Sequence, residues 1–159
     1  MINPTAQKVQ EMLRSLGCDC TVIEFSESTR TAQEAAQRAG CELGQIVKSL
    51  VFRGQSSGKA ILVLASGANR VDEAQLSRLT GEAIGRADAN FVRSVTGYSI
   101  GGIPPVGYTQ NIETYLDEDL LQYASVWAAA GTPNAIFEIP PRELLRITRA
   151  RVTPIKPNP

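Results

Sequence analysis

Two strongly apolar runs separated by a short polar turn constrain the fold more than any other feature of this chain. Residues 46–53 and 59–65 have the composition of β-strands, and the segment between them, Gly54-Gln55-Ser56-Ser57-Gly58, favours a turn. The sequence therefore predicts an antiparallel hairpin near the middle of the chain. The first strand of this hairpin carries one cation, Lys48, among apolar neighbours.

The segments on either side of the hairpin contain both helical and strand patterns. Apolar spacing and capping residues predict helices over residues 4–16, 31–39, 72–79 and 140–150, and a short acidic helix around 117–121. Another short helix is predicted to begin at Asp88 or Asn90 and to run toward Val95. Further strands are predicted at 21–25, 84–87, 112–116, 125–129 and 136–139. Neither G-x-G-x-x-G nor G-x-x-x-x-G-K-[ST] occurs, which disfavours a doubly wound nucleotide-binding fold.

These elements predict a single α/β (α+β) domain over residues 1–159, with a mixed, curved sheet and surrounding helices. The proline-rich end, residues 152–159, is expected to be a frayed tail. No apolar run approaches the ~20 residues of a membrane span, and residues 1–8 lack the layout of a signal peptide. A cytoplasmic protein without membrane contact is therefore the expectation.

The titratable residues restrict the chemistry that is open to this chain. It contains no histidine, and its three cysteines, Cys18, Cys20 and Cys41, lack the spacing of zinc or redox pairs. No metal site is expected. The formal net charge is zero, so the whole molecule has no excess charge that would attract nucleic acid.

Basic residues nevertheless concentrate near the C-terminal end. Residues 140–159 contain five Lys or Arg against one Glu, a local charge of +4 that leaves −4 for the rest. Arg142, Arg146 and Arg149 have i, i+4, i+7 spacing and would share one helical face. This face is either an ordinary solvated surface or a rim that contacts nucleic-acid phosphates, and the sequence leaves both open.

Lys48 is the main candidate for a catalytic side chain. Because side chains alternate along a strand, Lys48 shares a face with Leu50 and Phe52, whereas Ser49 faces the other way. A lysine at this position can extend its amine to water at the strand edge. Alternatively, desolvation can lower its basicity, so that it accepts a proton or stabilises a developing oxyanion.

A glycine–proline loop, residues 96–108, is the second candidate. Adjacent Gly101 and Gly102 can expose backbone amides because no Cβ blocks the approach of a ligand. Pro104 and Pro105 then stiffen the exit of the loop. Such amides can hold a carbonyl or phosphate oxygen.

Three segments together resemble the YbaK/ProX family: Lys48-Ser49-Leu50, the Gly101-x-x-x-Pro105 loop, and Ala128-Ala129-Ala130-Gly131. The resemblance covers roughly residues 5–145. Members of this family are free-standing editing domains that deacylate mischarged tRNA, and they are related to the editing domain inserted in bacterial prolyl-tRNA synthetases. The resemblance implies a barrel-like mixed sheet with helices packed outside it.

The resemblance also implies roles for individual residues. Lys48 falls on the essential lysine of the family, which lies beside the ester that links the amino acid to the terminal adenosine. The implied substrate-binding residues are Ser49, Gly101, Gly102, Ile103, Pro105, Ala130 and Gly131. No cofactor is implied. The implied partners are a mischarged tRNA, foremost tRNA(Pro) carrying a small non-cognate amino acid, and prolyl-tRNA synthetase.

Two departures from the family leave the edited amino acid open. Tyr108 stands where many relatives have His, and Asn134 lies near a position where relatives carry Ser or His.

The sequence also allows three other functions to be compared with the deacylase. Ser49 facing away from Lys48 disfavours a Ser–Lys hydrolase, and nothing distinguishes Glu113 and Asp117 from ordinary acidic residues as a carboxylate pair for a glycosidase. A non-catalytic module that binds aminoacyl-tRNA or a synthetase is the main alternative to the deacylase.

Overall fold

The structure is a computed structural model that describes residues 2–108 and 110–157. The helices are α1 (Pro4–Ser15), α2 (Ala32–Ala39), α3 (Glu73–Thr80), α4 (Ala89–Thr96) and α5 (Pro141–Thr148), with short 3₁₀ turns η1 (Leu43–Gln45) and η2 (Glu118–Gln122). The strands are β1 (Val22–Glu24), β2 (Val47–Gly54), β3 (Ala60–Ser66), β4 (Ile84–Arg86), β5 (Glu113–Asp117), β6 (Val126–Ala129), β7 (Ala135–Ile139) and β8 (Arg151–Thr153). Every predicted helix and strand is confirmed, with shifts of one or two residues at the ends.

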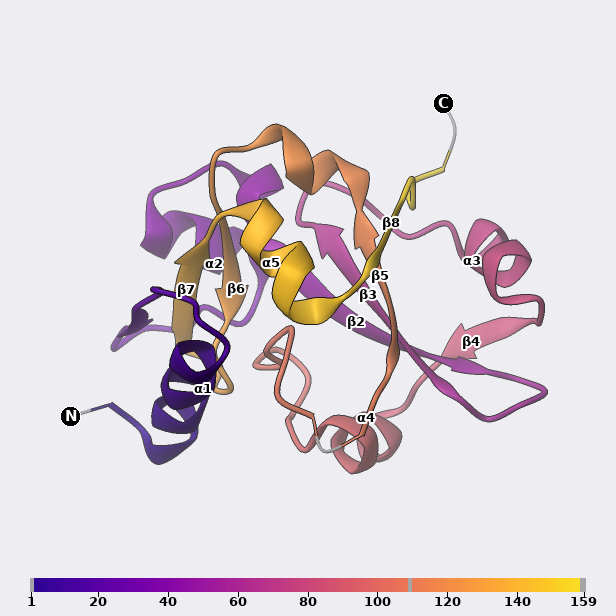
Figure 1. The fold of residues 1–159 in the computed structure, drawn as a ribbon, viewed down its shortest axis with the longest axis horizontal. Coiled ribbons are helices and arrows are strands. Elements are labelled where there is room, and N and C mark those ends of the chain that lie inside the picture. The colour runs from indigo at the N-terminus through magenta and orange to yellow at the C-terminus, as the bar shows by residue number, and fades with distance from the viewer. Residues whose placement is uncertain (1, 109, 158–159) are drawn as a thin grey trace.

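The strands form two sheets that meet at one end of β2. A three-stranded antiparallel sheet has the order β1-β7-β6, and a five-stranded mixed sheet has the order β4-β2-β3-β5-β8. Figure 1 shows the smaller sheet on the side of α1 and the larger one toward α3. A parallel bridge between Ile46 and Trp127 joins them. The predicted mixed, curved sheet is therefore confirmed, but the sheet does not close into a barrel.

The predicted hairpin is the centre of the larger sheet. β2 and β3 pair from Val47 opposite Ser66 to Arg53 opposite Ala60. Their faces bury different clusters: Val47 packs with Leu62 and Leu64 in the main core between the sheets. Phe52 packs with other residues in a second cluster on the outer face. Both faces are covered, which explains why β3 is almost continuously apolar.

Local sequence signals start and stop the helices that flank the site. Thr31 and Glu34 form a reciprocal capping box at the start of α2, which ends at Gly40 in the left-handed conformation. Asp72 accepts hydrogen bonds from the first amides of α3.

Within the described residues, no helix combines the length and apolar character that crossing a bilayer requires.

The expectation that residues 152–159 form a frayed tail is wrong for the part of this segment nearest the domain. Arg151–Thr153 forms β8, which pairs in parallel with β5. Ile155 is 3% exposed, and its carbonyl oxygen accepts a hydrogen bond from the Asp72 amide at 2.7 Å. Burial of one isoleucine and the pairing of an otherwise free sheet edge outweigh the effect of the prolines. Residues 158–159 lie outside the described residues.

Candidate functional site

A small cavity of about 230 Å³ lies between α2, β2, β6 and the glycine–proline loop. Ala32 and Ala35 of α2 line one side. Ala129 and Ile136, which face each other across the β6–β7 ladder, line another. With Trp127 added, the wall is mostly apolar, and the space that it encloses is small. The cavity therefore suits a small side chain rather than a drug-sized ligand, which needs about 300–1,000 Å³.

Lys48 lines this cavity and is half-buried. Its Nζ donates a hydrogen bond to the Asn69 carbonyl oxygen at 2.6 Å. Burial lowers the pKa of Lys48 below its usual range, and the nearby Asp117 carboxylate partly opposes this shift. The structure thus presents a cation in an apolar setting, with hydrogen-bond donors left for an incoming group.

The Asn69 carbonyl oxygen is held in place by a chain of polar contacts. The Asn69 side-chain amide donates to Asp117 Oδ2 and to Asp119 Oδ2, each at 2.8 Å. Asp117 is 1% exposed and also accepts from the Ser66 amide at 2.9 Å. Lys156 Nζ lies 2.9 Å from Asp119 Oδ2. The segment that orients the Lys48 amine is therefore tied to both β5 and the C-terminal end.

The glycine–proline loop contributes one glycine and two isoleucines to the cavity wall, Gly101, Ile100 and Ile103. Gly101 has φ +95°, and a Cβ at this position would lie 2.5 Å from the Arg30 side chain. Only glycine allows Arg30 to pack across the loop here. The Gly102 amide donates to the Ser99 carbonyl oxygen at 3.1 Å, so it is already used within the turn. Of the two predicted amides, that of Gly101 is the better placed for a ligand.

The remaining predicted substrate-binding residues lie around the cavity rather than in its wall. Ala130 is fully buried in the main core, and Pro105 lines a separate surface hollow. The Gly131 amide donates to the Gly102 carbonyl oxygen at 2.8 Å, which ties the loop to the end of β6. These three residues shape the backbone that carries Gly101 and Ala129.

Ser49 follows Lys48 in β2, and its Oγ is buried with no hydrogen-bond partner among the described residues. Ser49 lies opposite Leu64, on the core face, whereas Lys48 lies opposite Ala65 on the other face. The predicted alternation is therefore confirmed. Because the two side chains face apart, Lys48 is not placed to activate this hydroxyl.

A second cavity of about 420 Å³ adjoins the first. Both are lined by Lys48, Ser49, Leu50, Ile100 and Ile103, so they form one cleft with Lys48 at the junction. The charged residues that line the second cavity, apart from Lys48, are Arg70, Arg86 and Glu73. The sequence does not reveal Arg30, Arg70, Arg86 and Trp127 as cavity residues, because their places in the lining depend on tertiary structure.

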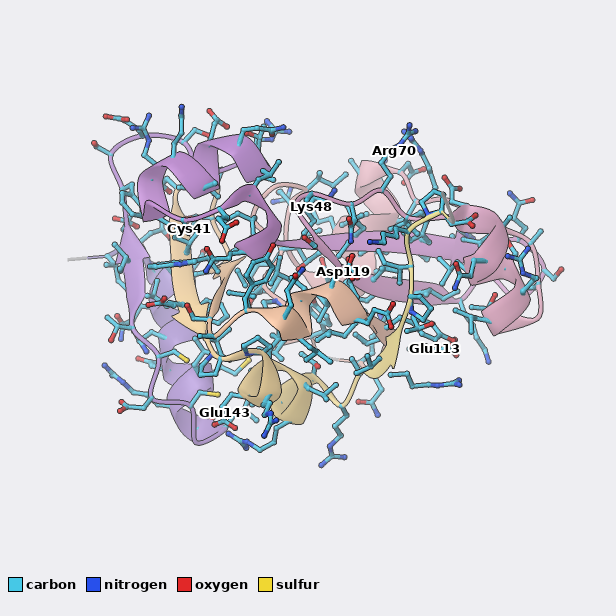
Figure 2. All side chains as sticks on the ribbon, turned by 90° about the horizontal axis from the view of Figure 1, so that it is seen from above. Cys41, Lys48, Arg70, Glu113, Asp119 and Glu143 are labelled. Atoms are coloured by element: carbon cyan, nitrogen blue, oxygen red, sulfur yellow. The ribbon has the colours of Figure 1, made fainter. Side chains whose placement is uncertain are left out.

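The predicted basic rim lies on another part of the molecule. In Figure 2, Glu143 of α5 lies on the side opposite Lys48 and Arg70. Arg146 forms a two-point ion pair with Glu143, at 2.7 and 3.0 Å. The helix ends at Thr148, and Arg149 follows as a cap with φ +54°. The contact of Arg142, Arg146 and Arg149 with tRNA phosphates stays a prediction.

The carboxylates weighed for glycosidase chemistry are poorly placed for it. Glu113 and Asp117 stand four residues apart on β5, which separates them by about 13 Å along a strand. Paired glycosidase carboxylates lie within about 9.5 Å of each other. In the part of the chain that is described, no three His, Cys, Asp or Glu residues are grouped to hold a metal ion.

Comparison with known proteins gives one consistent family. The family described as aminoacyl-tRNA editing domain matches residues 26–147. A solved structure of a proposed trans-editing enzyme for prolyl tRNA synthetase has 49% sequence identity and a TM-score of 0.93, and the match covers 99% of this chain and 100% of the other. EbsC of Enterococcus faecalis, a proposed Cys-tRNA(Pro)/Cys-tRNA(Cys) deacylase, is 29% identical over 82% of this chain and 80% of its own length.

A larger relative shows the same domain inside a synthetase. The proline–tRNA ligase of Bacillus licheniformis is 31% identical over 70% of this chain, which corresponds to 19% of the ligase. The chain belongs to the aminoacyl-tRNA editing domain family. The resemblance inferred from the lysine strand and the glycine–proline loop is confirmed.

Proposed function

We propose that this protein is a trans-editing deacylase that hydrolyses mischarged aminoacyl-tRNA, with tRNA(Pro) carrying a small non-cognate amino acid as its substrate. One observation carries the proposal: a half-buried lysine stands where a small apolar cavity meets a larger, cation-lined one. An aminoacyl-tRNA has two matching parts, because its ester joins a small amino-acid side chain to a large polyanionic RNA. The relatives named for prolyl-tRNA editing support the choice of tRNA.

In this mechanism a water molecule attacks the ester carbonyl carbon, and negative charge develops on the carbonyl oxygen. The Lys48 ammonium donates a hydrogen bond to that oxygen, in an apolar site where such a contact is stronger than in water. The bond between the carbonyl carbon and the ribose oxygen then breaks. The ribose oxygen takes up the proton that water loses, and the products are free amino acid and uncharged tRNA.

Water rather than a serine is the nucleophile in this proposal. Ser49 has the nearest hydroxyl in sequence, but it lies on the opposite face of β2 from Lys48. The Gly101 amide is proposed as a second donor to the substrate carbonyl, and the terminal ribose hydroxyl of the tRNA as an aid in orienting the water. No metal or organic cofactor enters these steps.

The small cavity selects the amino acid by size. Its mostly apolar lining should separate ligands that differ by one methylene by about 1–3 kcal/mol and reject an added hydroxyl only weakly. We therefore expect activity on more than one small residue and little on bulky ones. Pro-tRNA(Pro) must be spared by shape, because the proline ring is rigid.

The proposal is tested with a panel of tRNA(Pro) charged with alanine, serine, cysteine, threonine, proline and leucine. Hydrolysis of small non-cognate esters, with Pro-tRNA(Pro) spared, supports it. A non-catalytic binding module would bind charged tRNA without turnover above the spontaneous rate. Rapid hydrolysis of the leucyl ester would show that the small cavity does not act as a size filter.

Prolyl-tRNA synthetase is the proposed partner that releases the mischarged tRNA, and the cytoplasm is the proposed compartment because tRNA charging supplies the substrate there. Retention of activity with synthetase absent would show that the partner is dispensable for the chemistry. A rise in turnover on adding the synthetase would support delivery of the tRNA.

A further inference from the structure

A buried carboxylate, that of Asp117, lies near Lys48 but is not paired with it. Asp117 is 1% exposed, and its charge raises the pKa of Lys48 against the lowering effect of burial. Within the described residues the two side chains form no ion pair, and Lys48 Nζ instead binds the Asn69 carbonyl oxygen at 2.6 Å. Buried charges in proteins are usually paired with an opposite charge. The separation of this cation from this carboxylate therefore has a structural cause.

The oxygens of Asp117 are already occupied by amide donors. Oδ2 accepts hydrogen bonds from the Ser66 amide at 2.9 Å and from the Asn69 side-chain amide at 2.8 Å. Oδ1 accepts from the Asp119 amide at 3.0 Å. Three N–H donors stabilise the ionised carboxylate in place of a cation. Two of these donors belong to the backbone, so Asn69 supplies the one donor that a substitution can remove.

Asn69 uses both its side chain and its carbonyl oxygen in this arrangement. A side-chain amide has two N–H bonds, and the second of them binds Asp119 Oδ2 at 2.8 Å. Asp119 in turn is held by Lys156, whose Nζ lies 2.9 Å from the same oxygen. Figure 2 labels Lys48 and Asp119, which these hydrogen bonds connect through Asn69. Asn69 therefore binds the carboxylate and the ammonium at the same time and keeps them apart.

Other charged groups surround the cleft and the support of Asn69, but none of them replaces this pair of contacts. The pKa of Lys48 is shifted by burial and by Asp117. The placement of the amine is therefore decided between Asp117, which attracts it, and Asn69, which holds it. The remaining charged groups, from several elements, are Arg30, Arg70, Glu73, Arg86, Asp119 and Lys156.

We propose that Asn69 is a positioning residue for the reaction at Lys48: its side-chain amide occupies Asp117, and its carbonyl oxygen holds the ammonium. An ammonium has three N–H donors, so Asn69 takes one and leaves two for the ester. Pairing with Asp117 would draw the ammonium toward a buried group and away from the ester. The inference rests on the proposed deacylase function for its effect on turnover, whereas the placement of the ammonium is measurable without substrate.

The test uses Asn69→Ala, the double variant Asn69→Ala/Asp117→Asn, and the control Gln10→Ala. Gln10 is another buried side-chain amide, and it lies between α1 and β1, outside both cavities. It donates to the Cys20 carbonyl oxygen at 2.7 Å and accepts from the Val22 amide at 2.8 Å. The control therefore shows what the loss of one such amide does to the protein away from Lys48.

Three quantities are measured for each protein. Steady-state hydrolysis of tRNA(Pro) charged with alanine gives kcat and KM. An NMR titration of the lysine side chains, with Lys48→Ala for assignment, gives the pKa of Lys48 in the absence of substrate. A crystal structure of Asn69→Ala gives the position of Lys48 Nζ relative to Asp117.

Asn69→Ala should lower kcat by up to about 10²-fold, because a displacement of about 1 Å in a reacting group can have an effect of this size. KM should change little, since the ammonium acts on charge that develops in the transition state. The pKa of Lys48 should rise, because the carboxylate then faces the ammonium directly. The crystal structure should show Nζ within about 4 Å of an Asp117 oxygen, the usual limit of an ion pair.

The double variant separates capture of the ammonium from general loosening of the site. With the Asp117 carboxylate removed, the pKa of Lys48 should fall below its value in Asn69→Ala, and kcat should recover in part. Entry of solvent around Lys48 would also raise its pKa, but that rise would persist in the double variant. Gln10→Ala should leave kcat and the pKa of Lys48 near their original values.

Three results would overturn the inference: Asn69→Ala matching Gln10→Ala in kcat, a raised pKa that persists in the double variant, or a crystal structure of Asn69→Ala without the ion pair. If the double variant does not fold, that crystal structure decides. Absent deacylation by the unmodified protein would reject the proposed function, while the pKa and the crystal structure would still decide whether Asn69 places the ammonium.

Discussion

Two faces of the molecule carry arginines, and they differ in what surrounds the charge. On the cleft face, Arg70 and Arg86 line a cavity and have no partners among the described residues. On the α5 face, Arg146 is already paired with Glu143, and Arg149 caps the helix. The α5 set is conspicuous in sequence because its spacing is regular. The arginines of the cleft show no such pattern in the sequence, since they come from different structural elements.

The difference teaches that charge spacing along a chain and charge convergence in space are separate signals. An i, i+4, i+7 pattern describes one side of one helix and says nothing about what that side faces. Unpaired cations that line one cavity beside a desolvated lysine indicate a binding site, because all of them can contact the same bound polyanion. We therefore expect function to follow the cleft face.

The largest effect is expected at Lys48. Lys48→Ala should lower deacylation by roughly 10²–10³-fold, the usual cost of removing one oxyanion donor, with folding intact. Lys48→Arg should also be poor, because the guanidinium differs in shape from an ammonium. Lys59→Ala, on the exposed end of the same hairpin, is the matched control. A folded Lys48→Ala protein with undiminished turnover would contradict the assignment of the cleft as the active site.

A smaller effect is expected from narrowing the small cavity. Ala129→Val adds two methyl groups to the wall and should disfavour the larger substrates by roughly tenfold relative to alanine. The salt dependence of tRNA binding should stay the same, since no charge changes. Relative kcat/KM on alanyl, cysteinyl and threonyl esters measures the shift. Ala130→Val is its companion: that side chain is fully buried, so overpacking should lower stability by about 1–3 kcal/mol.

The pH profile of the deacylation rate should shift modestly when the Asp117 carboxylate near Lys48 is removed. If the ammonium form is active, deacylation falls as pH rises through the pKa of Lys48, which burial has lowered. Asp117 raises that pKa, so Asp117→Asn should move the fall to lower pH. Enzyme rates corrected for spontaneous ester hydrolysis give the profile. A rate that instead rises through the same pH range would mean that Lys48 acts as a proton acceptor.

The smallest effect is expected on the α5 face. Replacing Arg142, Arg146 and Arg149 with Gln should reduce the salt slope of tRNA binding by less than Arg70→Gln/Arg86→Gln does, because Arg146 is already neutralised by Glu143. Activity on a minimal aminoacyl-adenosine should not change. A larger slope change from the α5 variant than from the cleft variant would reverse the ranking of the two faces.

Local patterns predicted most of the fold and the central residue of the site. The β2–β3 hairpin, the helix caps and the face of Lys48 follow from alternation and capping, which act over a few residues. The docking of β8 was missed, because it depends on a partner strand 36 residues earlier in the chain. The hydrogen bond from the Gly102 amide to the Ser99 carbonyl oxygen was missed for a related reason. The sequence does not show which backbone amides are already bonded within a turn.

The pairing of β8 with β5 also has a consequence for synthesis on the ribosome. Asn69 binds Asp119, and Asp119 binds Lys156, so the support of the Lys48 amine includes a residue more than 100 positions downstream. Contacts of such separation form late in folding, after most of the chain has emerged. A nascent chain stalled before residue 151 would contain the β2 strand with Lys48 but would lack the contact of Lys156 with Asp119. The cleft should therefore gain its final geometry only as one of the last steps of folding.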